Sequence, residues 1–376
     1  MTQSTPNLLL GSDRAELVSI IEAAGEPSFR VQQVLEAIYR NRVDSIDRIT
    51  TLPLQFRAKL ISAGYSVGLA SIEKRFVSQD GTVRYLMAFG DGQSVETVWM
   101  PEGDGGETGD GTEAGDSSEP GTRTWDRATI CISSQVGCAV DCQFCLTALL
   151  GVKRNLTAGE IVGQVLRVLS DQNVSLPQDR VNLVFMGMGE PFLNYDNFMK
   201  AVRLLVEEVG ISESRMTVST AGIVPRIYDF GSESIRPKLA ISLNASNDEA
   251  RTRLMPINRK WNLERLITAA HDFPLRNRER ITFEYVLLNG VNDDTQNARE
   301  VAALLKGMRS KVNLIALNPG PGIDFSTPAA DRVTAFQNAL INAGIPTFVR
   351  RPRGLDIFAA CGQLKRTVEI ATSPAL

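Results

Sequence analysis

Histidine, cysteine and long apolar runs are all scarce in this chain of 376 residues. The only histidine, His271, stands at an expected helix end facing solvent, so base chemistry here does not rest on histidine. Five cysteines are few and odd in number for this length, which argues against a secreted disulfide framework. There is no charged-then-apolar leader at Met1 and no unbroken apolar run of membrane length. We therefore expect a cytoplasmic protein without membrane contact, built from one large core and a small accessory domain.

The charge of the chain is unevenly distributed. Residues 101–124 contain seven acidic residues, one arginine and seven glycines, but no large apolar residue. That stretch carries a charge of −6, so the rest of the chain carries +3 although the formal net charge is −3. A segment without apolar residues cannot offset the entropy lost on ordering. We therefore expect residues 102–124 to be a disordered acidic insertion.

Three cysteines follow an expected strand at Thr129–Ser134 with the spacing Cys138-x3-Cys142-x2-Cys145. Thiolates hold iron–sulfur clusters, and a cubane with only three of them keeps one iron open for another ligand. The alternative is a structural zinc site, which needs four closed ligands, and only Cys131 could be the fourth. The spacing and the strand–loop position resemble the radical S-adenosylmethionine enzymes, in which that cofactor binds the open iron. This resemblance implies one 4Fe–4S cluster held by Cys138, Cys142 and Cys145.

The rest of the pattern predicts an α/β fold. Short apolar strands alternate with helical stretches, and the strands are expected at Thr129–Ser134, Val181–Met186, Met216–Ser219, Leu239–Leu243, Ile281–Leu287 and Val312–Leu317. Six β/α units predict a parallel sheet curled into a partial (β/α)6 barrel of the radical-SAM type, with its chemistry at the carboxyl ends of the strands.

The part before the insertion is expected to be separate from the barrel. Apolar residues recur at helical spacing in Phe29–Tyr39, and two runs, Thr82–Phe89 and Ser94–Met100, predict a β-hairpin around Gly90–Gly92. The expected domains are a helical accessory domain at 1–70, a β-hairpin extension at 71–101, the insertion at 102–124, the radical-SAM core at 125–356 and a C-terminal segment at 357–376.

Two further motifs narrow the resemblance. The run Met186–Pro191 (Met-Gly-Met-Gly-Glu-Pro) follows the second expected strand, where glycines let the backbone approach a ligand closely. A plain tight turn is the alternative, but after a cluster loop the run resembles the motif that holds the methionine end of S-adenosylmethionine. Together with Cys131–Cys138 and Ala359–Leu364, it resembles the RlmN/Cfr family of RNA methyltransferases, which methylate adenine on a ring carbon.

The resemblance implies catalytic roles for two cysteines outside the cluster loop. Cys361 would accept a methyl group from one S-adenosylmethionine, and a second molecule would be cleaved to a radical, so that two are consumed per methylation. Cys131 would then release the product by forming a transient disulfide with Cys361. A small buried apolar residue is the alternative for each of them. Glu96 would be the proton acceptor, and strand alternation places it beside Val98 and Met100, where an apolar surrounding would raise its pKa.

The resemblance also implies cofactor contacts at the strand ends, namely Gly189, Glu190, Ser219, Ser242, Leu243, Asn244 and Asn318. The alternative is that these polar residues simply mark the places where strands end and loops begin, as polar residues commonly do. The chain departs from the family pattern at Asn244, where relatives usually carry histidine, although asparagine can still donate or accept a hydrogen bond. It departs again at Gly354–Asp356, where two adjacent acids are expected.

The implied partners are 23S ribosomal RNA, transfer RNA and a reductant such as flavodoxin or ferredoxin, with the chain acting as a monomer. Candidate RNA contacts are Arg40, Arg42, Lys153–Arg154 and Arg350–Arg353, since basic clusters neutralise phosphates. The resemblance favours methylation of adenine C2. Two alternatives stay open: the C8-specific branch of the same family, and a noncatalytic RNA-binding protein with a structural metal site.

Overall fold

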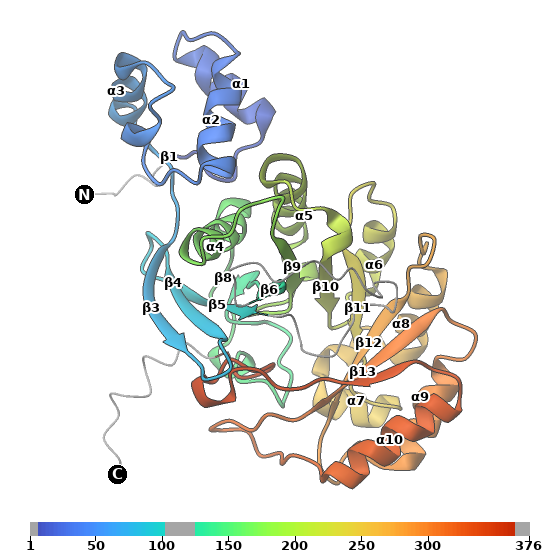
Figure 1. Ribbon diagram of the computed structural model, residues 1–376. Coiled ribbons are helices and arrows are strands. Elements are labelled where there is room, and N and C mark those ends of the chain that lie inside the picture. The colour runs from blue at the N-terminus through green and yellow to red at the C-terminus, as the bar shows by residue number, and fades with distance from the viewer. Residues whose placement is uncertain (1–6, 102–124, 365–376) are drawn as a thin grey trace.

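The computed structural model describes residues 7–101 and 125–364 (Figure 1). Its helices are α1 (Arg14–Ala23), α2 (Arg30–Leu35), α3 (Leu54–Ser62), α4 (Ala158–Asp171), α5 (Tyr195–Leu204), α6 (Val224–Gly231), α7 (Asp248–Leu254), α8 (Leu263–Asp272), α9 (Thr295–Leu304) and α10 (Ala330–Asn342). The expected acidic insertion, 102–124, lies outside the described residues, as does the end of the expected C-terminal segment, 365–376.

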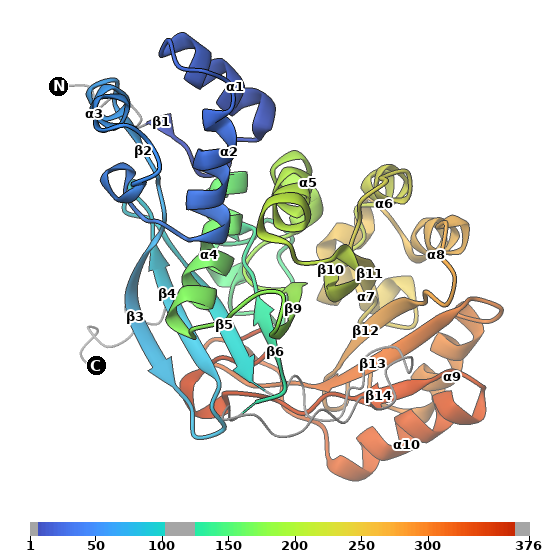
Figure 2. The ribbon, with the colours of Figure 1, turned by 45° about the horizontal axis from the view of Figure 1, so that its top comes forward.

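One large sheet organises the molecule. Its strands follow the order β14-β13-β12-β11-β10-β9-β6-β5-β4-β3. In chain order these are β3 (Ser71–Val77), β4 (Val83–Ala88), β5 (Ser94–Pro101), β6 (Arg127–Cys131), β9 (Arg180–Phe185), β10 (Met216–Thr220), β11 (Lys238–Ser242), β12 (Ile281–Leu287), β13 (Ser310–Ala316) and β14 (Thr347–Val349). Every pair from β6 to β14 is parallel. The six expected strands of the partial barrel are therefore confirmed, and Figure 2 shows helices α4 to α10 around the outside of the curved sheet.

The two faces of the parallel strands differ in burial. On β6, Ala128 and Ile130 are fully buried beneath the outer helices, whereas Arg127, Thr129 and Cys131 on the inner face are only half-buried. The same alternation recurs in β9 and β10. Successive residues of a strand point to opposite faces, so apolar residues hold the helices and polar residues face the inside. The inside of this barrel is consequently a cavity rather than a second apolar core.

Two strands of the large sheet were not expected. β14 adds a seventh parallel strand beside β13, but it has only three residues between Pro346 and the basic run at Arg350–Arg353. β3 pairs antiparallel with β4, which makes the extension three-stranded rather than a simple hairpin. Exposed charged residues at 73–75 interrupt its apolar alternation, and pairing with β4 rather than its own pattern makes it a strand.

Two smaller sheets complete the strands. β1 (Asn7–Leu8) pairs in parallel with β2 (Tyr65–Ser66) and closes the helical unit formed by α1, α2 and α3. β7 (Gln135–Val136) pairs antiparallel with β8 (Arg154–Asn155) just after β6. The expected helix at Phe29–Tyr39 is confirmed as α2, which a π-helical turn continues over Glu36–Arg40.

Two candidate RNA-binding arginines instead fasten the helical unit to the barrel. Arg40 donates to the carbonyl oxygens of Val209 (3.3 Å) and Glu207 (3.4 Å) at the end of α5, and Arg42 donates to that of Val174 (2.8 Å) after α4. Figure 1 shows the helical unit standing beside α4 and α5. Because their guanidinium groups bind backbone oxygens of the barrel, Arg40 and Arg42 hold the helical unit in position.

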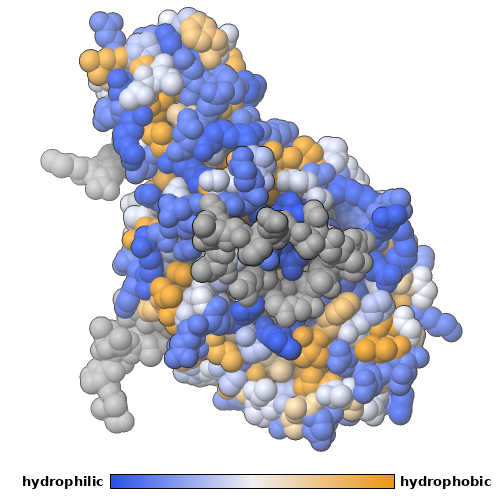
Figure 3. All heavy atoms as spheres, viewed as in Figure 1, coloured by the Kyte–Doolittle hydropathy of each residue, from blue (hydrophilic) through white to orange (hydrophobic). Residues whose placement is uncertain are grey.

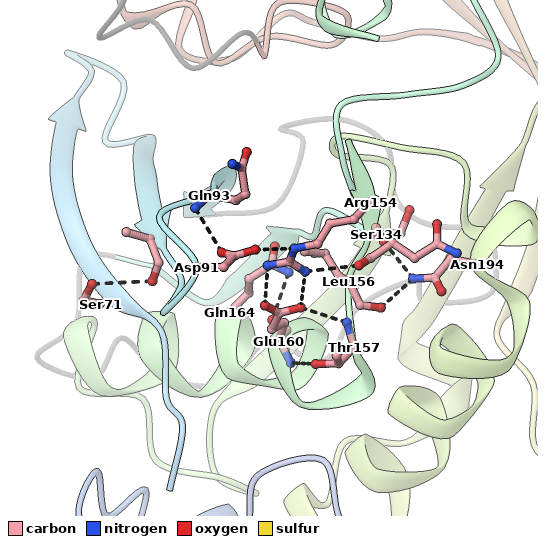
Figure 4. Close-up of polar contacts among 12 residues, drawn as sticks. Ser71, Asp91, Gln93, Ser134, Arg154, Leu156, Thr157, Glu160, Gln164 and Asn194 are labelled. Carbon is pink, nitrogen blue, oxygen red and sulfur yellow. Dashed lines mark hydrogen bonds and ion pairs between the residues drawn. The ribbon is translucent and has the colours of Figure 1, made fainter. Parts of the chain in front are cut away.

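An ion-pair network joins the hairpin extension to the first barrel helix (Figure 4). Arg154 on β8 bonds Asp91 in the β4–β5 turn at 2.6 Å and both carboxylate oxygens of Glu160 at 2.7 Å. Glu160 also belongs to the capping box that begins α4, in which the side chain of Thr157 accepts from the Glu160 N–H. Hydrogen bonding to Glu160, then to Asp91, raises the pKa of Arg154. Because these two carboxylates already occupy its guanidinium N–H groups, Arg154 is poorly placed to bind a phosphate.

Gln164 connects three elements inside the core. Its side-chain oxygen accepts from Thr97 Oγ1 (2.8 Å) and from the Ser133 N–H (2.9 Å), and its nitrogen donates to the Ser133 carbonyl oxygen (3.0 Å). All three residues are fully buried. The amide therefore locks α4 to β5 and to the chain that leaves β6 towards the cysteine loop.

We predict that Gln164→Ala lowers the free energy of unfolding by about 2–4 kcal/mol, because it leaves several buried polar groups without partners. Urea denaturation of the purified protein measures this change. Gln296→Ala, which removes an exposed amide on α9, serves as the control and should have almost no effect. Equal unfolding midpoints for the two variants would show that the buried network does not stabilise the fold.

Candidate functional site

The three clustered cysteines lie on a loop above the carboxyl ends of the parallel strands. The loop is held by backbone bonds from Cys138 N–H to the Gly151 oxygen (3.3 Å) and from Gln143 N–H to the Leu254 oxygen (3.0 Å). A small apolar cluster lies beneath it and contains Val140, Phe144, Ala221, Leu254, Met255, Leu288 and Leu317, with Cys138 and Cys142 packed against it. Phe144 thus anchors the loop to the barrel.

All three thiols face one cavity of about 160 Å³. Burial raises the pKa of Cys138 to about 12 and that of Cys142 well above its ordinary value, and neighbouring thiols in the loop add to both shifts. Iron binding would reverse this protonation, because a coordinated thiol is deprotonated. No three His, Cys, Asp or Glu side chains in residues 7–101 and 125–364 gather closely enough to hold a single metal ion. The donor set of three thiols on one short loop fits a 4Fe–4S cluster, whose thiolates bind different irons.

Gly187 and Gly189 let two parts of the chain pass close to each other. A Cβ atom on Gly187 would lie 2.7 Å from Ser133 Oγ, and one on Gly189 would lie 2.6 Å from the Gln135 Cβ. Gly189 also has φ +99°, which side chains strongly disfavour. We expected glycines that admit a ligand; the contacts show that these glycines also admit the segment after β6.

Glu190 is buried and faces the same cavity. One carboxylate oxygen accepts from the Ala221 N–H at 2.7 Å and the other from the Phe192 N–H at 3.0 Å. Burial outweighs these hydrogen bonds and raises the pKa of Glu190 to about 7. An ammonium group placed beside it would favour the charged form, so Glu190 suits the amino end of an amino-acid ligand.

The other expected cofactor contacts fall into two groups. Ser219, Ser242, Asn244 and Asn318 line the cavity with Gly189 and Glu190. Leu243 is fully buried in the core, and its N–H donates to the Glu284 oxygen at 2.9 Å. Asn244 has φ +56°, a left-handed conformation that asparagine tolerates better than most residues. Its backbone geometry explains how asparagine can occupy this position.

Two polar residues of the site escaped sequence reasoning. Glu284 on β12 accepts from Ser219 Oγ at 2.7 Å and pairs with Arg350 at 3.5 Å. Arg251 on α7 is fully buried and donates to the carbonyl oxygens of Ala221 (2.7 Å) and Ser242 (3.1 Å), among others. In the sequence, Glu284 is a charged residue inside an apolar strand, and Arg251 is a basic residue in a short helix. Each pattern is common, and only the folded contacts distinguish these two.

Cys131 and Cys361 line a second, larger cavity of about 240 Å³, which shares Cys145, Gly187, Asn318 and Cys361 with the first. Burial raises the pKa of Cys131 to about 12, and the neighbouring Cys361 adds to the shift. Cys361 itself is exposed on its loop. The fold therefore brings the two extra cysteines to one cavity that adjoins the cysteine loop.

Four hydrogen bonds hold the segment of Cys361 against the barrel rim. The Leu146 N–H donates to the Gly362 oxygen (2.8 Å), and Thr147 Oγ1 donates to the Leu364 oxygen (2.8 Å). Asn318 Nδ2 donates to the Cys361 oxygen (3.5 Å), and Gln363 Nε2 donates to the Pro319 oxygen (2.9 Å). The loop that carries the clustered cysteines thus directly supports the segment that carries Cys361.

Two carboxylates link the same segment to the β3–β4 turn, and we call this pair the turn latch (Asp80 and Asp356). Asp80 accepts from the Gly354 N–H at 3.0 Å, and Asp356 accepts from Ser78 Oγ at 2.5 Å and from the Gln79 N–H at 3.2 Å. Burial opposes ionisation of Asp80, but hydrogen bonds from Gly354 and Thr82 prevail and lower its pKa to about 2. Asp356 alone makes the contacts to Ser78 and Gln79, although the family resemblance predicts two adjacent acids in this segment.

Glu96 is buried but does not lie in the apolar surrounding that we expected. Glu96 lies on β5 and is ion-paired with Arg84 on the neighbouring strand β4. Both side chains are buried on the same face of the sheet. The Arg84 guanidinium in turn lies 4.1 Å from the centre of the Phe76 ring. A buried carboxylate keeps its charge when a guanidinium compensates it. Arg84 is therefore part of the environment of Glu96 that strand alternation alone could not reveal.

A curved parallel sheet with a three-cysteine loop above its carboxyl ends defines a radical S-adenosylmethionine enzyme. Residues 132–302 match the radical SAM superfamily, and residues 7–64 match the ribosomal RNA large subunit methyltransferase N-terminal domain. The chain is 67% identical to a probable dual-specificity RNA methyltransferase RlmN of Koribacter versatilis, over 94% of this chain and all of that protein. It is 44% identical to the dual-specificity RNA methyltransferase RlmN of Syntrophobacter fumaroxidans, over 93% and 95% of the two chains.

A solved structure agrees with these sequence relatives. The crystal structure of a radical SAM methyltransferase from Sphaerobacter thermophilus superposes with a TM-score of 0.84 at 40% identity, covering 96% of this chain and 99% of that one. The chain belongs to the RlmN family of radical S-adenosylmethionine RNA methyltransferases. The 4Fe–4S cluster and S-adenosylmethionine expected from the sequence are the cofactors of that enzyme class.

We predict that Gly189→Ala abolishes S-adenosylmethionine binding. The added methyl group must displace Gln135, and the backbone of an alanine is strained at the positive φ of this position. Isothermal titration of the cluster-loaded enzyme measures the affinity. Gly344→Ala is the matched control, since Gly344 has φ +83° and no neighbour within 4 Å of an added Cβ. Wild-type affinity in Gly189→Ala would show that the close packing here is dispensable.

We predict that cutting the turn latch with Asp80→Ala and Asp356→Ala increases the rate of alkylation of Cys361 several-fold, because its segment loses both links to the turn. Mass spectrometry after iodoacetamide treatment measures the rate. Glu73→Gln, an exposed change on β3, is the control. In the wild type the lowered pKa of Asp80 keeps this link complete above about pH 4 and lets it open only as the pH falls towards about 2. The link is therefore intact at the neutral pH at which the Cys361 thiol can be alkylated.

Proposed function

We propose that this chain methylates C2 of a specific adenine in 23S ribosomal RNA, and also of the adenine 3′ to the anticodon in transfer RNA. The single observation that carries the proposal is the meeting of Cys131 and Cys361 in one cavity beside the cysteine loop. Ring carbon 2 of adenine has no lone pair, so methylation there needs radical chemistry and a sulfur that carries the new carbon. The names of the relatives, dual-specificity RNA methyltransferases, support two classes of RNA substrate.

The cofactors would occupy the smaller cavity. Cys138, Cys142 and Cys145 would hold the 4Fe–4S cluster, which would supply the electron that cleaves bound S-adenosylmethionine to methionine and a 5′-deoxyadenosyl radical. Glu190 would receive the ammonium group, beside the Gly189 backbone. Ser219, Ser242, Asn244 and Asn318 would orient the remaining polar groups from the strand ends, and Leu243 can contribute only its backbone, since its side chain is buried.

Cys361 and Cys131 would exchange bonds at sulfur. The Cys361 thiol would lose its proton and accept a methyl group, and transfer of a hydrogen atom from that methyl to the 5′-deoxyadenosyl radical would allow a carbon–carbon bond to adenine C2. The adduct would then return one electron to the redox partner and lose the C2 proton. The Cys131 thiolate would attack the Cys361 sulfur, so that an S–S bond forms while the bond between sulfur and the RNA-bound carbon breaks and that carbon takes up a proton to become the methyl group. Because burial raises the pKa of Cys131 to about 12, this attack requires prior deprotonation of its thiol.

Glu96 would accept the proton that leaves adenine C2. It shares a strand face with Val98 and Met100, which line the larger cavity. Its ion pair with Arg84 would fix the position of the carboxylate. Arg84 therefore acts with Glu96 in this scheme.

The remaining expectations belong to the same proposal. The chain would act as a monomer in the cytoplasm, with electrons from a reductant such as flavodoxin or ferredoxin. The segment up to residue 70 would contact RNA, the extension at 71–101 would support Cys361, and the core at 125–356 would hold the cofactors. No helix in the described part of the chain is long and apolar enough to span a bilayer.

Nucleoside analysis tests the proposal. The chain is expressed in bacteria that lack their own enzyme, and ribosomal and transfer RNA are digested separately and separated against standards. We expect 2-methyladenosine in both fractions, and the Cys361→Ala variant should give none. The 8-methyl isomer would assign the chain to the C8-specific branch, and absence of any methyladenosine from cluster-loaded protein would refute the assigned substrate.

We predict that Cys131→Ala stops turnover with RNA covalently attached to Cys361, because no thiolate can release the product. Denaturing gels and peptide mapping detect the adduct. Ser134→Ala, a substitution on the adjoining chain outside the cavity lining, is the control and should release its product. Free methylated RNA from Cys131→Ala would contradict the paired-thiol assignment.

A further inference from the structure

A fully buried arginine lies beside the cysteine loop. Charged side chains usually lie in water, and Figure 3 shows mainly hydrophilic residues on the surface that it draws, with scattered hydrophobic ones. Arg251 on α7 is instead fully buried. Taking a guanidinium out of water is costly unless hydrogen bonds and an opposite charge compensate it. The partners of Arg251 must therefore explain its position.

Hydrogen bonds of Arg251 reach the ends of two neighbouring parallel strands. Its Nη2 donates to the carbonyl oxygens of Ala221 after β10 (2.7 Å) and of Ser242 at the end of β11 (3.1 Å). Its Nε donates to the carbonyl oxygen of Leu243 (3.1 Å), and its Nη1 donates to Asn258 Oδ1 (3.0 Å). One guanidinium thus ties the carboxyl ends of β10 and β11 to each other and to the turn after α7.

These strand ends carry groups that we expect to contact S-adenosylmethionine. The Ala221 N–H donates to Glu190 at 2.7 Å, so the residue whose oxygen binds Arg251 also fixes the carboxylate proposed for the ammonium group. Ser242 Oγ lies 3.2 Å from Ser219 Oγ, and both hydroxyl groups belong to residues that line the smaller cavity. Arg251 is not among the described lining residues, so it acts on this cavity through its neighbours.

The hydrogen bonds of Arg251 do not neutralise its charge. In the described part of the chain they go to neutral oxygens, three of the backbone and one of an amide. Asp248 acts on the guanidinium from an exposed position, and its carboxylate already accepts from Asn258 Nδ2 (2.8 Å) and from the Leu263 N–H (2.8 Å). Burial lowers the pKa of Arg251 only to about 10, so it stays charged at neutral pH.

The cysteine loop lies against the same helix. The Gln143 N–H donates to the Leu254 oxygen at 3.0 Å, and Cys142 packs against the apolar cluster that contains Leu254 and Met255. Cys142 acts on the charge of Arg251 more strongly than Asp248 does. An iron–sulfur cluster held by three thiolates is an anion, and it gains another negative charge when it is reduced. Such a cluster would supply the opposite charge that the hydrogen bonds of Arg251 do not provide.

We propose that Arg251 is a positioning residue of the cofactor site, which holds the ends of β10 and β11 in place and whose charge stabilises the reduced cluster. This inference rests on the part of the proposed function that places the cluster on Cys138, Cys142 and Cys145. Reduction adds one electron from the reductant of the proposed function. A nearby positive charge favours the reduced form over the oxidised form, so it raises the reduction potential.

A redox titration followed by electron paramagnetic resonance tests the charge in the cluster-loaded enzyme without S-adenosylmethionine. In Arg251→Gln and Arg251→Met, the ratio of reduced to oxidised cluster at a fixed potential should fall about tenfold, which is a midpoint about 59 mV lower for one electron. Arg251→Lys keeps the charge and should retain the wild-type midpoint. Arg253→Gln, an exposed change on the same helix, is the control. Wild-type midpoints in both neutral variants, or an equal fall in Arg251→Lys, would overturn the charge role.

Isothermal titration with S-adenosylmethionine tests the positioning role. Arg251→Lys should bind this ligand several-fold more weakly than the wild type, because one ammonium group cannot donate to the carbonyl oxygens of both strand ends and to Asn258. Arg253→Gln should again match the wild type. A residue that served only the fold would alter this affinity but leave the midpoints of the neutral variants unshifted. Wild-type affinity in Arg251→Lys would contradict the positioning role.

Two neutral variants keep the test independent of the folding of either one. A buried charge can often be replaced by an apolar residue of similar size without loss of stability, so Arg251→Met decides the question if Arg251→Gln does not fold. Loss of the cluster from both neutral variants, with retention in Arg251→Lys, would also support the charge role.

Nucleoside analysis of RNA separates this inference from the proposed function. Lowered midpoints in the neutral variants, with no methyladenosine from the wild type, would refute the proposed function and leave the role of Arg251 standing. Methyladenosine from the wild type, with unshifted midpoints in the neutral variants, would do the reverse.

Discussion

The hollow inner face of the parallel sheet is the constraint on which the rest of the molecule depends. Because side chains alternate along a strand, the apolar residues that hold the outer helices leave every second position facing inward. On β6 those inward positions carry Arg127, Thr129 and Cys131, of which only the small Cys131 packs against the apolar core. The helices and the outer face must therefore supply the burial that stabilises the barrel. In return, the interior is available for a nucleotide, a cofactor and two thiols.

The placement of Cys361 depends on long-range contacts more than on secondary structure. Its segment contains only the short 3₁₀ turn Leu355–Ile357, and it is held by the cysteine loop, the Asn318 loop and the turn latch. Single hydrogen bonds contribute about 1 kcal/mol each, so several together can define one position while each can still open. In the proposed mechanism the Cys361 sulfur meets a methyl donor, an adenine and Cys131 in succession, and such a support would suit it. Removal of one contact should shift its position before it unfolds the barrel.

The sequence sufficed for the features that local patterns encode. Apolar runs located the six parallel strands, and the cysteine spacing identified the enzyme class that the comparisons confirm. The pattern missed β3 and β14, because one is charged and the other is very short, and pairing with neighbours makes both into strands. It also missed Arg84, Arg251 and Glu284. Each owes its role to partners far away in sequence, and no spacing rule brings Arg84 to Glu96 or Arg251 to the carbonyl oxygens after β10.

The direction of the strands gives the site a polar axis. Carboxyl ends gather the cysteine loop and Glu190 at one end, and amino ends carry basic side chains such as Arg127, Lys238 and Lys311 at the other. A phosphate beside Glu190 or the thiolates would meet like charge, so the carboxyl ends disfavour the phosphates of a nucleic acid. Cys131 lies between them on β6, and Cys361 reaches the same cavity from outside the sheet. On this arrangement the two thiols meet inside the barrel beside the cavity of the cysteine loop, because one comes from a strand and the other from a segment outside the sheet.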